Sequence, residues 1–135
     1  TCHTFDMPAL MFPCALSPES GRAAMENILN EHPQVTSAIV WNDLAMLGAV
    51  QAIKARGLQI PEDISLICFD SPDSAHLYPF TPTVIEIGAE KIAAEAAQLM
   101  IDLLDGRSRS MQQLLIPPQL IVGDSTAAPA RTILT

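Results

Sequence analysis

Short apolar runs alternate with longer segments of helical periodicity along this chain, and this alternation limits the fold more than any other feature. Three apolar runs, at 37–41, 64–69 and 83–87, are predicted as strands. The segments at 43–56 and 89–105 repeat apolar residues three and four positions apart, as amphipathic helices do. Strands that are apolar throughout are typical of a parallel sheet covered on both faces. The pattern predicts an α/β fold with a doubly wound parallel sheet.

Local signals predict where the helices begin and end. Ser17 followed by Pro18 predicts the start of a further helix that runs to about Glu31, with the serine as N-cap and the proline in the first turn. Asp43 is the expected N-cap of the next helix. Gly57 is placed to take the left-handed conformation that follows a last helical turn.

Three segments are less regular. The apolar run 9–16 is interrupted by Pro13 and is predicted as a strand near a sheet edge. Residues 70–82 contain three prolines and are predicted as a long loop. Residues 114–122 are predicted to form one or two short strands.

Composition excludes several classes of protein. Hydrophobic residues make up 49% of the 135 residues and charged residues 16%, which excludes a disordered tail. Lys and Arg total 7 against 15 Asp and Glu, so the net charge of -8 repels phosphate backbones and disfavours direct nucleic-acid contact by this chain. No apolar run approaches the ~18 residues of a membrane span, so no membrane partner is expected.

Signatures of catalysis, metal binding and cofactor binding are missing. There is no Walker loop, GxSxG, GxGxxG or HExxH motif. The cysteines Cys2, Cys14 and Cys68 form no CxxC pair, and the three histidines are isolated in sequence, so neither a disulfide framework nor a zinc site is expected. We expect a binding protein with no cofactor. An enzyme on a doubly wound sheet is the disfavoured alternative.

Polar residues follow two of the predicted strands. Ligands of an open parallel sheet bind outside the carboxyl ends of its strands, and neighbouring strands lie ~4.8 Å apart. Asn42 and Asp70 would therefore converge on one small polar molecule if their strands are neighbours, and they suit sugar hydroxyls or a purine edge. Each residue alone has a second interpretation as a turn residue. Trp41 closes a strand, and packing in a core or interface is favoured over a stacking role.

Several stretches of this sequence, taken together, resemble the lactose-repressor/galactose-repressor (LacI/GalR) family. They are SPESG at 17–21, AIVWNDLAMLGA at 38–49, RGLQIPEDISLICFD at 56–70 and LIVGDST at 120–126. The resemblance covers nearly the whole chain from about Ala9. It implies a class I periplasmic-binding-protein-like effector core with two lobes and a cleft. Residues from 1 to about 85 would form the C-terminal lobe, about 86–118 would belong with a missing N-terminal lobe, and 119–135 would be the closing strand and tail.

The resemblance also implies roles for particular residues. Asn42 and Asp70 match polar effector contacts of the family, and Leu16 occupies the place where many members have an aromatic ring that stacks on the effector. The helix at 43–56 and the loop reaching Tyr78 would form a dimer interface, in which we name the helix residues Met46, Ala49 and Val50. Departures such as Trp41 in place of a small residue leave the effector's identity open.

These observations lead to one functional expectation and one rival. We expect the effector-sensing portion of a cytoplasmic LacI/GalR-type transcription regulator or repressor. Its full-length homodimer would bind operator DNA through a helix-turn-helix that is absent from this chain. Because the chain starts at Thr1 with no signal segment, a fragment is expected. The rival is a periplasmic sugar-binding protein of a transport system, against which the segment at 57–63 and the Ser125-Thr126 ending favour the repressor.

Overall fold

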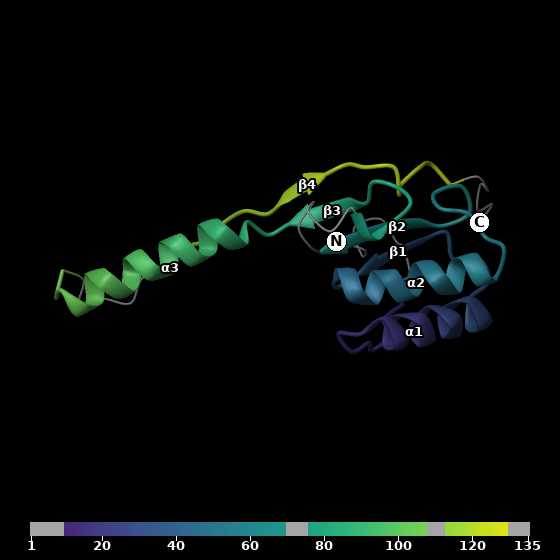
Figure 1. The fold of residues 1–135 in the computed structure, drawn as a ribbon, viewed down its shortest axis with the longest axis horizontal. Coiled ribbons are helices and arrows are strands. Elements are labelled where there is room, and N and C mark those ends of the chain that lie inside the picture. Colours follow the sequence, from purple (N-terminus) through teal and green to yellow (C-terminus); the bar gives the residue numbers. More distant parts are fainter. Residues whose placement is uncertain (1–9, 70–75, 108–112, 130–135) are drawn as a thin grey trace.

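The fold is a four-stranded mixed sheet with two helices layered against it and a third helix set apart (Figure 1). The computed structural model describes residues 10–69, 76–107 and 113–129. The strands are β1 (Ser37–Val40), β2 (Ser65–Phe69), β3 (Thr83–Glu86) and β4 (Gln119–Ile121), in the spatial order β1-β2-β3-β4. β1, β2 and β3 are parallel, and β4 returns antiparallel to β3. The predicted α/β class and parallel strands are therefore confirmed.

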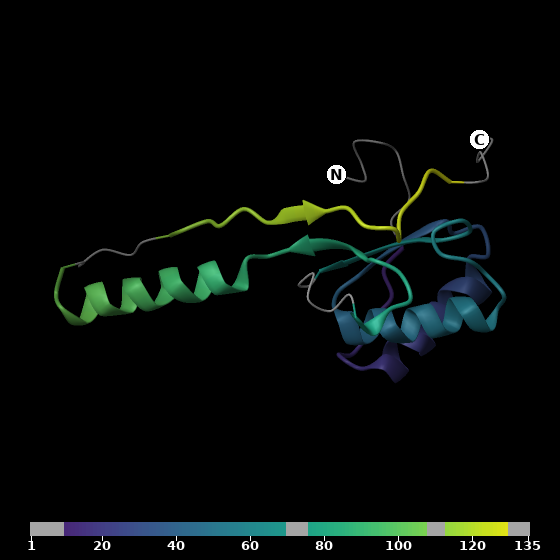
Figure 2. The same ribbon diagram turned by 45° about the horizontal axis from the view of Figure 1, so that its top comes forward.

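Helices α1 (Pro18–Glu31) and α2 (Asp43–Ala55) lie on the same side of this sheet, with α2 next to the strands (Figures 1 and 2). The strand residues that face them, such as Leu66 and Cys68, are buried, whereas their neighbours Ile67 and Phe69 are only half-buried. Within the described ranges helices cover one face. The covering of both faces suggested by the apolar runs is not found there.

Two glycines bring the helices into close contact. A Cβ atom built on Gly48 would lie 1.8 Å from the carbonyl oxygen of Pro18, and one built on Gly21 would lie 2.0 Å from that of Ala45. Real Cβ atoms essentially never come within 3.0 Å of another heavy atom. The backbones of α1 and α2 therefore meet at a pair of positions where no side chain fits.

Segment 10–16 forms no strand, so the strand predicted at 9–16 was wrong for its described residues. Instead the segment turns into α1, since the Ser17 amide donates to the Ala15 carbonyl at 2.9 Å and the Ala15 amide donates to Ser20 Oγ at 2.8 Å. Pro13 contributes no N–H to a ladder. The start of α1 agrees with its prediction, because Ser17 is its N-cap and accepts from the Ser20 amide at 3.2 Å.

Helix α3 (Ala89–Leu104) extends away from the sheet and buries no residue (Figures 1 and 2). It begins after β3, and the chain returns beside it to β4. Its residues Ile92 and Leu99 face Leu115 and Ile116 across a shallow hollow of about 290 Å³. The assignment of 86–118 to another lobe stays a prediction.

The segment after β4 is hydrogen-bonded to β2 and β3 through Ser125. Ser125 is fully buried, and its hydroxyl accepts from the Thr83 amide at 2.7 Å and donates to the Leu66 carbonyl at 2.6 Å. The Leu66 amide in turn donates to the Ser125 carbonyl at 2.8 Å. One serine thus joins β2 and β3 to the end of the chain.

Candidate functional site

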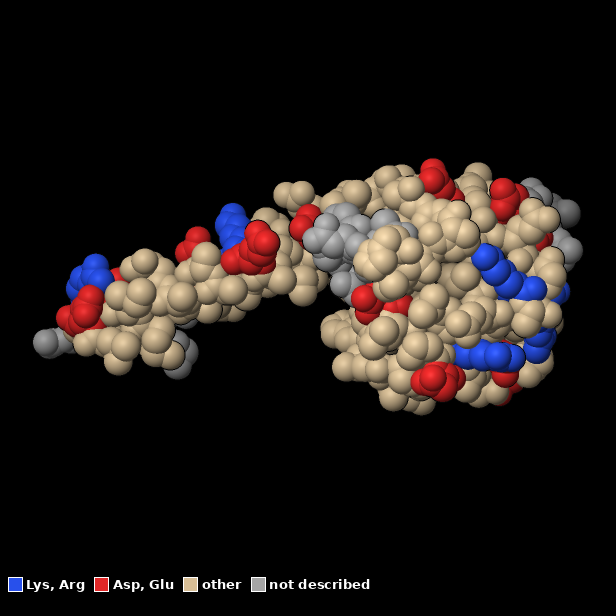
Figure 3. All heavy atoms as spheres, in the orientation of Figure 1, with Lys and Arg blue, Asp and Glu red and all other residues tan. Residues whose placement is uncertain are grey.

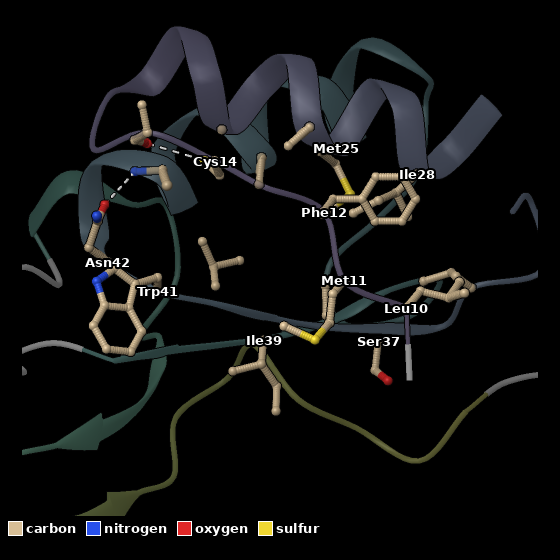
Figure 4. A pocket seen from close by; sticks show the side chains of 18 residues that line it. Leu10, Met11, Phe12, Cys14, Met25, Ile28, Ser37, Ile39, Trp41 and Asn42 are labelled. Carbon is tan, nitrogen blue, oxygen red and sulfur yellow. Dashed lines mark hydrogen bonds between the residues drawn. The ribbon is translucent and has the colours of Figure 1, made fainter. Parts of the chain in front are cut away.

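An apolar hollow lies beside β1, enclosed by segment 10–16 and the two packed helices (Figure 4). Its volume is about 640 Å³. Most of its lining is aliphatic or aromatic, and the described lining residues whose side chains carry a polar atom are Ser37, Asn42, Cys14 and, through its indole N–H, Trp41. The hollow reaches the carboxyl end of β1, which is where ligands of parallel sheets bind.

Asn42 stands at that end and is fixed in place by the helix that it starts. Its backbone is extended, with φ -153° and ψ 170°, and its Oδ1 accepts from the Ala45 amide at 2.8 Å. Asn42, and not Asp43 as predicted, is therefore the N-cap of α2. Asp43 is the first helical residue, and its carboxylate accepts from the Leu44 amide at 2.6 Å. Since the amide oxygen of Asn42 is engaged, its NH₂ group is the part suited to donate to a ligand.

The partner expected for Asn42 cannot be placed, because Asp70 lies outside the described residues. The register of the sheet bears on the argument nonetheless. Val40 pairs with Cys68 in neighbouring parallel strands, so the carboxyl ends of β1 and β2 are side by side. Leu16, the third predicted effector contact, is 65% exposed and does not line the hollow.

The contact between two aromatic rings at these strand ends is a feature that the sequence analysis did not predict. Trp41 follows β1 directly, and its ring centroid lies 5.6 Å from that of Phe69, the last residue of β2. Trp41 is 70% exposed, so it does not pack in the core of this chain, and its packing in an interface stays a prediction. The sequence signal that could have indicated exposure is the position of Trp41 between an apolar strand and the polar N-cap of the next helix.

The residues expected at a dimer interface lie inside this chain. Met46, Ala49 and Val50 of α2 are buried in the core, between α1 and the sheet. Tyr78 is also buried, and its hydroxyl donates to the Asp43 carbonyl at 2.8 Å while its ring stacks on Phe80. These four residues are therefore covered within this chain and present little surface to a partner, whereas Leu44 of α2 is 43% exposed. The dimer itself stays a prediction.

Acidic, histidine and cysteine side chains gather nowhere into a metal site within the described ranges. Acidic and basic residues are scattered over the view in Figure 3, and α3 carries both signs. Hydrogen bonds from its own backbone amide and from Ser17 at the start of α1 lower the pKa of the Glu19 carboxyl group below the ordinary 4.5. A search of the described residues for a helix that could cross a membrane found none.

Comparison with known proteins places this arrangement among binding domains. Residues 3–126 match the family described as a periplasmic binding protein-like domain. Two similar proteins are named HTH-type transcriptional repressor PurR: one from Edwardsiella ictaluri, 32% identical over 110 residues, and one from Pasteurella multocida, 31% identical over 108. These matches cover 82% and 80% of this chain and 32% of each relative.

Solved structures give the same result for the fold. A LacI family transcriptional regulator from Bifidobacterium animalis matches with a TM-score of 0.86 and 28% identity, over 96% of this chain and 47% of that one. A lac repressor dimer bound to operator and an anti-inducer matches with a TM-score of 0.84 and 26% identity, over 94% and 44%. A transcriptional regulator CelR–cellobiose complex matches with a TM-score of 0.86 and 25% identity, over 92% and 39%. This chain thus spans about a third of the length of the curated relatives it matches and less than half of these solved chains.

Proposed function

Because the chain belongs to the periplasmic binding protein-like domain family, within its LacI/GalR group of regulators, we propose that it is the effector-sensing portion of a transcription regulator. In this role it binds a small molecule and does not transform it. Binding biases the full-length dimer between two arrangements that differ in affinity for operator DNA. We assign DNA contact to a part of the cytoplasmic protein other than this acidic chain.

The observation that carries the proposal is the fixed side-chain amide of Asn42 in the lining of an apolar hollow. A small-molecule site needs an apolar surface and a few polar groups held in one orientation. The hydrogen bond from the Ala45 amide to Asn42 Oδ1 supplies that fixed orientation, since turning the amide would uncap α2. Asp70, which follows β2 in sequence, is proposed as the second polar contact.

Names of the relatives favour regulation over transport. The curated relatives are called transcriptional repressors, and one matched solved protein is a repressor dimer bound to operator. Another is a regulator in complex with cellobiose. From these we take a sugar or a purine-like molecule as the ligand class and a homodimer as the assembly. Since Met46, Ala49 and Val50 are buried, exposed residues of α2 such as Leu44 are the proposed dimer contacts.

Calorimetry on the 135-residue chain with ribose, lactose, cellobiose, adenine and guanine tests the proposal. We expect Asn42→Ser to weaken binding several-fold at unchanged stability, because serine caps a helix as well as asparagine but carries no NH₂ donor. Asp70→Ala should weaken binding at least about tenfold. Asn27→Ser, the same exchange on the exposed side of α1, is the matched control and should change nothing.

Two results would contradict the proposal. One is the absence of binding by every molecule of the panel. The other is a bound molecule whose affinity is unchanged in both Asn42→Ser and Asp70→Ala, since the ligand would then occupy a different part of the molecule.

A further inference from the structure

We infer that residues 123–127, which we call the strap, are detachable: the strap and β4 open together while α1, α2 and the parallel strands β1, β2 and β3 stay folded. The strap lies at the amino ends of β2 and β3, because it is hydrogen-bonded to their first residues, Ser65 and Thr83. It is therefore at the opposite end of these strands from the candidate ligand site. The opening needs no ligand, so it lies outside the proposed function.

The strap begins where the chain leaves β3 and becomes a neighbour of β2. β4 pairs with β3 along its whole length. Gly123 is still bonded to β3, since its amide donates to Thr83 Oγ1 at 3.0 Å. Two residues later the partner is β2, because the Leu66 amide donates to the Ser125 carbonyl at 2.8 Å. The strap thus contacts both strands without extending either ladder far.

Gly123 is the position at which the backbone crosses from one strand to the other. A Cβ atom built on Gly123 would collide with the carbonyl oxygens of Thr81 and Pro82. Just after it, the Asp124 amide donates to the Thr81 carbonyl at 2.6 Å. Backbone therefore lies directly against backbone here, and a side chain at position 123 would push the strap away from the sheet.

Side-chain hydroxyls make most of the described bonds of the strap. Ser65 Oγ donates to the Ala127 carbonyl at 3.2 Å and accepts from the Ala127 amide at 3.1 Å. The hydroxyls of Thr83 and Thr126 lie 2.9 Å apart, and the buried hydroxyl of Ser125 has the two partners given above. Each such bond contributes only modestly to stability, since water takes its place when the strap leaves.

The hydrophobic core does not include the strap. Every buried member of the core lies between Met25 and Val84 in the sequence, and Ile121 is the one described residue after β3 that packs against it. Helix α3 buries no residue, and β4 is three residues long with its first two exposed. Opening of the strap and β4 therefore exposes little apolar surface, which is typical of segments that open locally at low free energy. Residues 87–129 would then stay joined to the body through β3 alone.

Native-state hydrogen exchange of the 135-residue chain, followed by NMR in low concentrations of urea, tests the inference. The amides of Leu66 and Thr83 donate to Ser125, so opening of the strap is enough to expose them. The amides of Val50 and Ile53 lie within α2 and report on unfolding of the helix layer. We expect the first pair to exchange at least about tenfold faster, with a weaker dependence on urea, because less surface is exposed.

Variants of the helix layer make the test differential. Ala23→Gly, on the exposed side of α1, destabilises the closed and the opened form alike. It should therefore speed exchange at Val50 and Ile53 about fivefold and leave Leu66 and Thr83 unchanged. Gly48→Ala should produce the same division with a larger effect.

A variant of the strap should behave differently. Gly123→Ala destabilises only the closed form and leaves Ser125 in place as the acceptor for both reporter amides. Overpacking of this size should speed exchange by about 5- to 150-fold, and by the same factor at Leu66, Thr83, Val50 and Ile53.

The outcomes are separate from those of the ligand experiments. Equal exchange and equal urea dependence at all four amides would overturn the inference, since strap and core would then unfold as one unit. Acceleration of all four amides by Ala23→Gly would overturn it as well, even where Gly48→Ala fails to fold. Unchanged exchange in Gly123→Ala would overturn the role of the crossing. Failure of every ligand in calorimetry would contradict effector sensing and leave the strap untouched.

Discussion

Replacing Gly48 by alanine should destabilise the chain, although alanine is the better helix former. In the interior of a helix the exchange by itself favours the folded state by about 1 kcal/mol. The added Cβ, however, would lie 1.8 Å from the Pro18 carbonyl oxygen, and it must reach at least 3.0 Å. The atoms must therefore part by about 1.2 Å, and the obstacle is backbone rather than a flexible side chain.

That displacement affects the core beneath the contact. Helix α2 lies between α1 and the sheet, so moving α1 loosens the packing around Met25 and Met46, which are buried. Overpacking of this kind costs about 1–3 kcal/mol, and we expect a net loss of that size in the free energy of unfolding. Urea denaturation followed by circular dichroism measures it.

Two companion variants make the test specific. Ala23→Gly, on the exposed side of α1, should cost about 1 kcal/mol and reports the propensity contribution alone. The double variant of Gly21→Ala and Gly48→Ala should lose less than the two single losses together, because one separation of the helices relieves both contacts. A Gly48→Ala protein as stable as the parent, or more stable, would refute the close contact.

Two further predictions concern single hydrogen-bonding groups. Ser125→Ala removes a donor and an acceptor from a fully buried site and leaves the Thr83 amide and the Leu66 carbonyl without this partner. It should therefore lower the free energy of unfolding by about 2–3 kcal/mol, measured by urea denaturation. An unchanged midpoint would contradict this prediction. Glu19 has a lowered pKa in the folded chain, so its carboxylate stabilises the fold above pH 4.5 and loses this effect as the pH falls through the lowered value. Glu19→Gln should therefore be less stable than the parent at neutral pH and equal to it in acid, and a difference that persists in acid would contradict this origin.

Locally encoded features were predictable from the sequence. The start of α1 depends on Ser17 and Pro18, which act within one turn, and the left-handed Gly57, with φ 72°, follows from the same kind of signal. The choice between Asn42 and Asp43 as N-cap was not decidable, because both side chains carry an oxygen that can accept from a helix amide. The structure selects Asn42, and that selection fixes the orientation of the candidate site.

Features that depend on distant segments were not predictable in the same way. Segment 10–16 has the composition of a strand, but a strand forms only if a neighbouring strand pairs with it. In this sheet β1 pairs with β2 and not with segment 10–16. The resemblance to the family places Met46, Ala49 and Val50 of α2 at a dimer interface, but all three are buried within this chain. A helix that is apolar on most sides is buried, and here the second layer is α1 of the same chain.

The path between β3 and β4 has a consequence for how the sheet assembles. These adjacent strands are joined through residues 87–118, which include all of α3. Doubling the length of such a connection adds only about 0.6 kcal/mol of closure entropy, so insertions in the excursion should hardly affect equilibrium stability. Folding speed depends on the same separation, since contacts between residues far apart in sequence form late. During synthesis the hydrogen bond from the Thr83 amide to Ser125 cannot form until residues 87–118 have been made, so the nascent sheet stays incomplete until Ser125 has emerged.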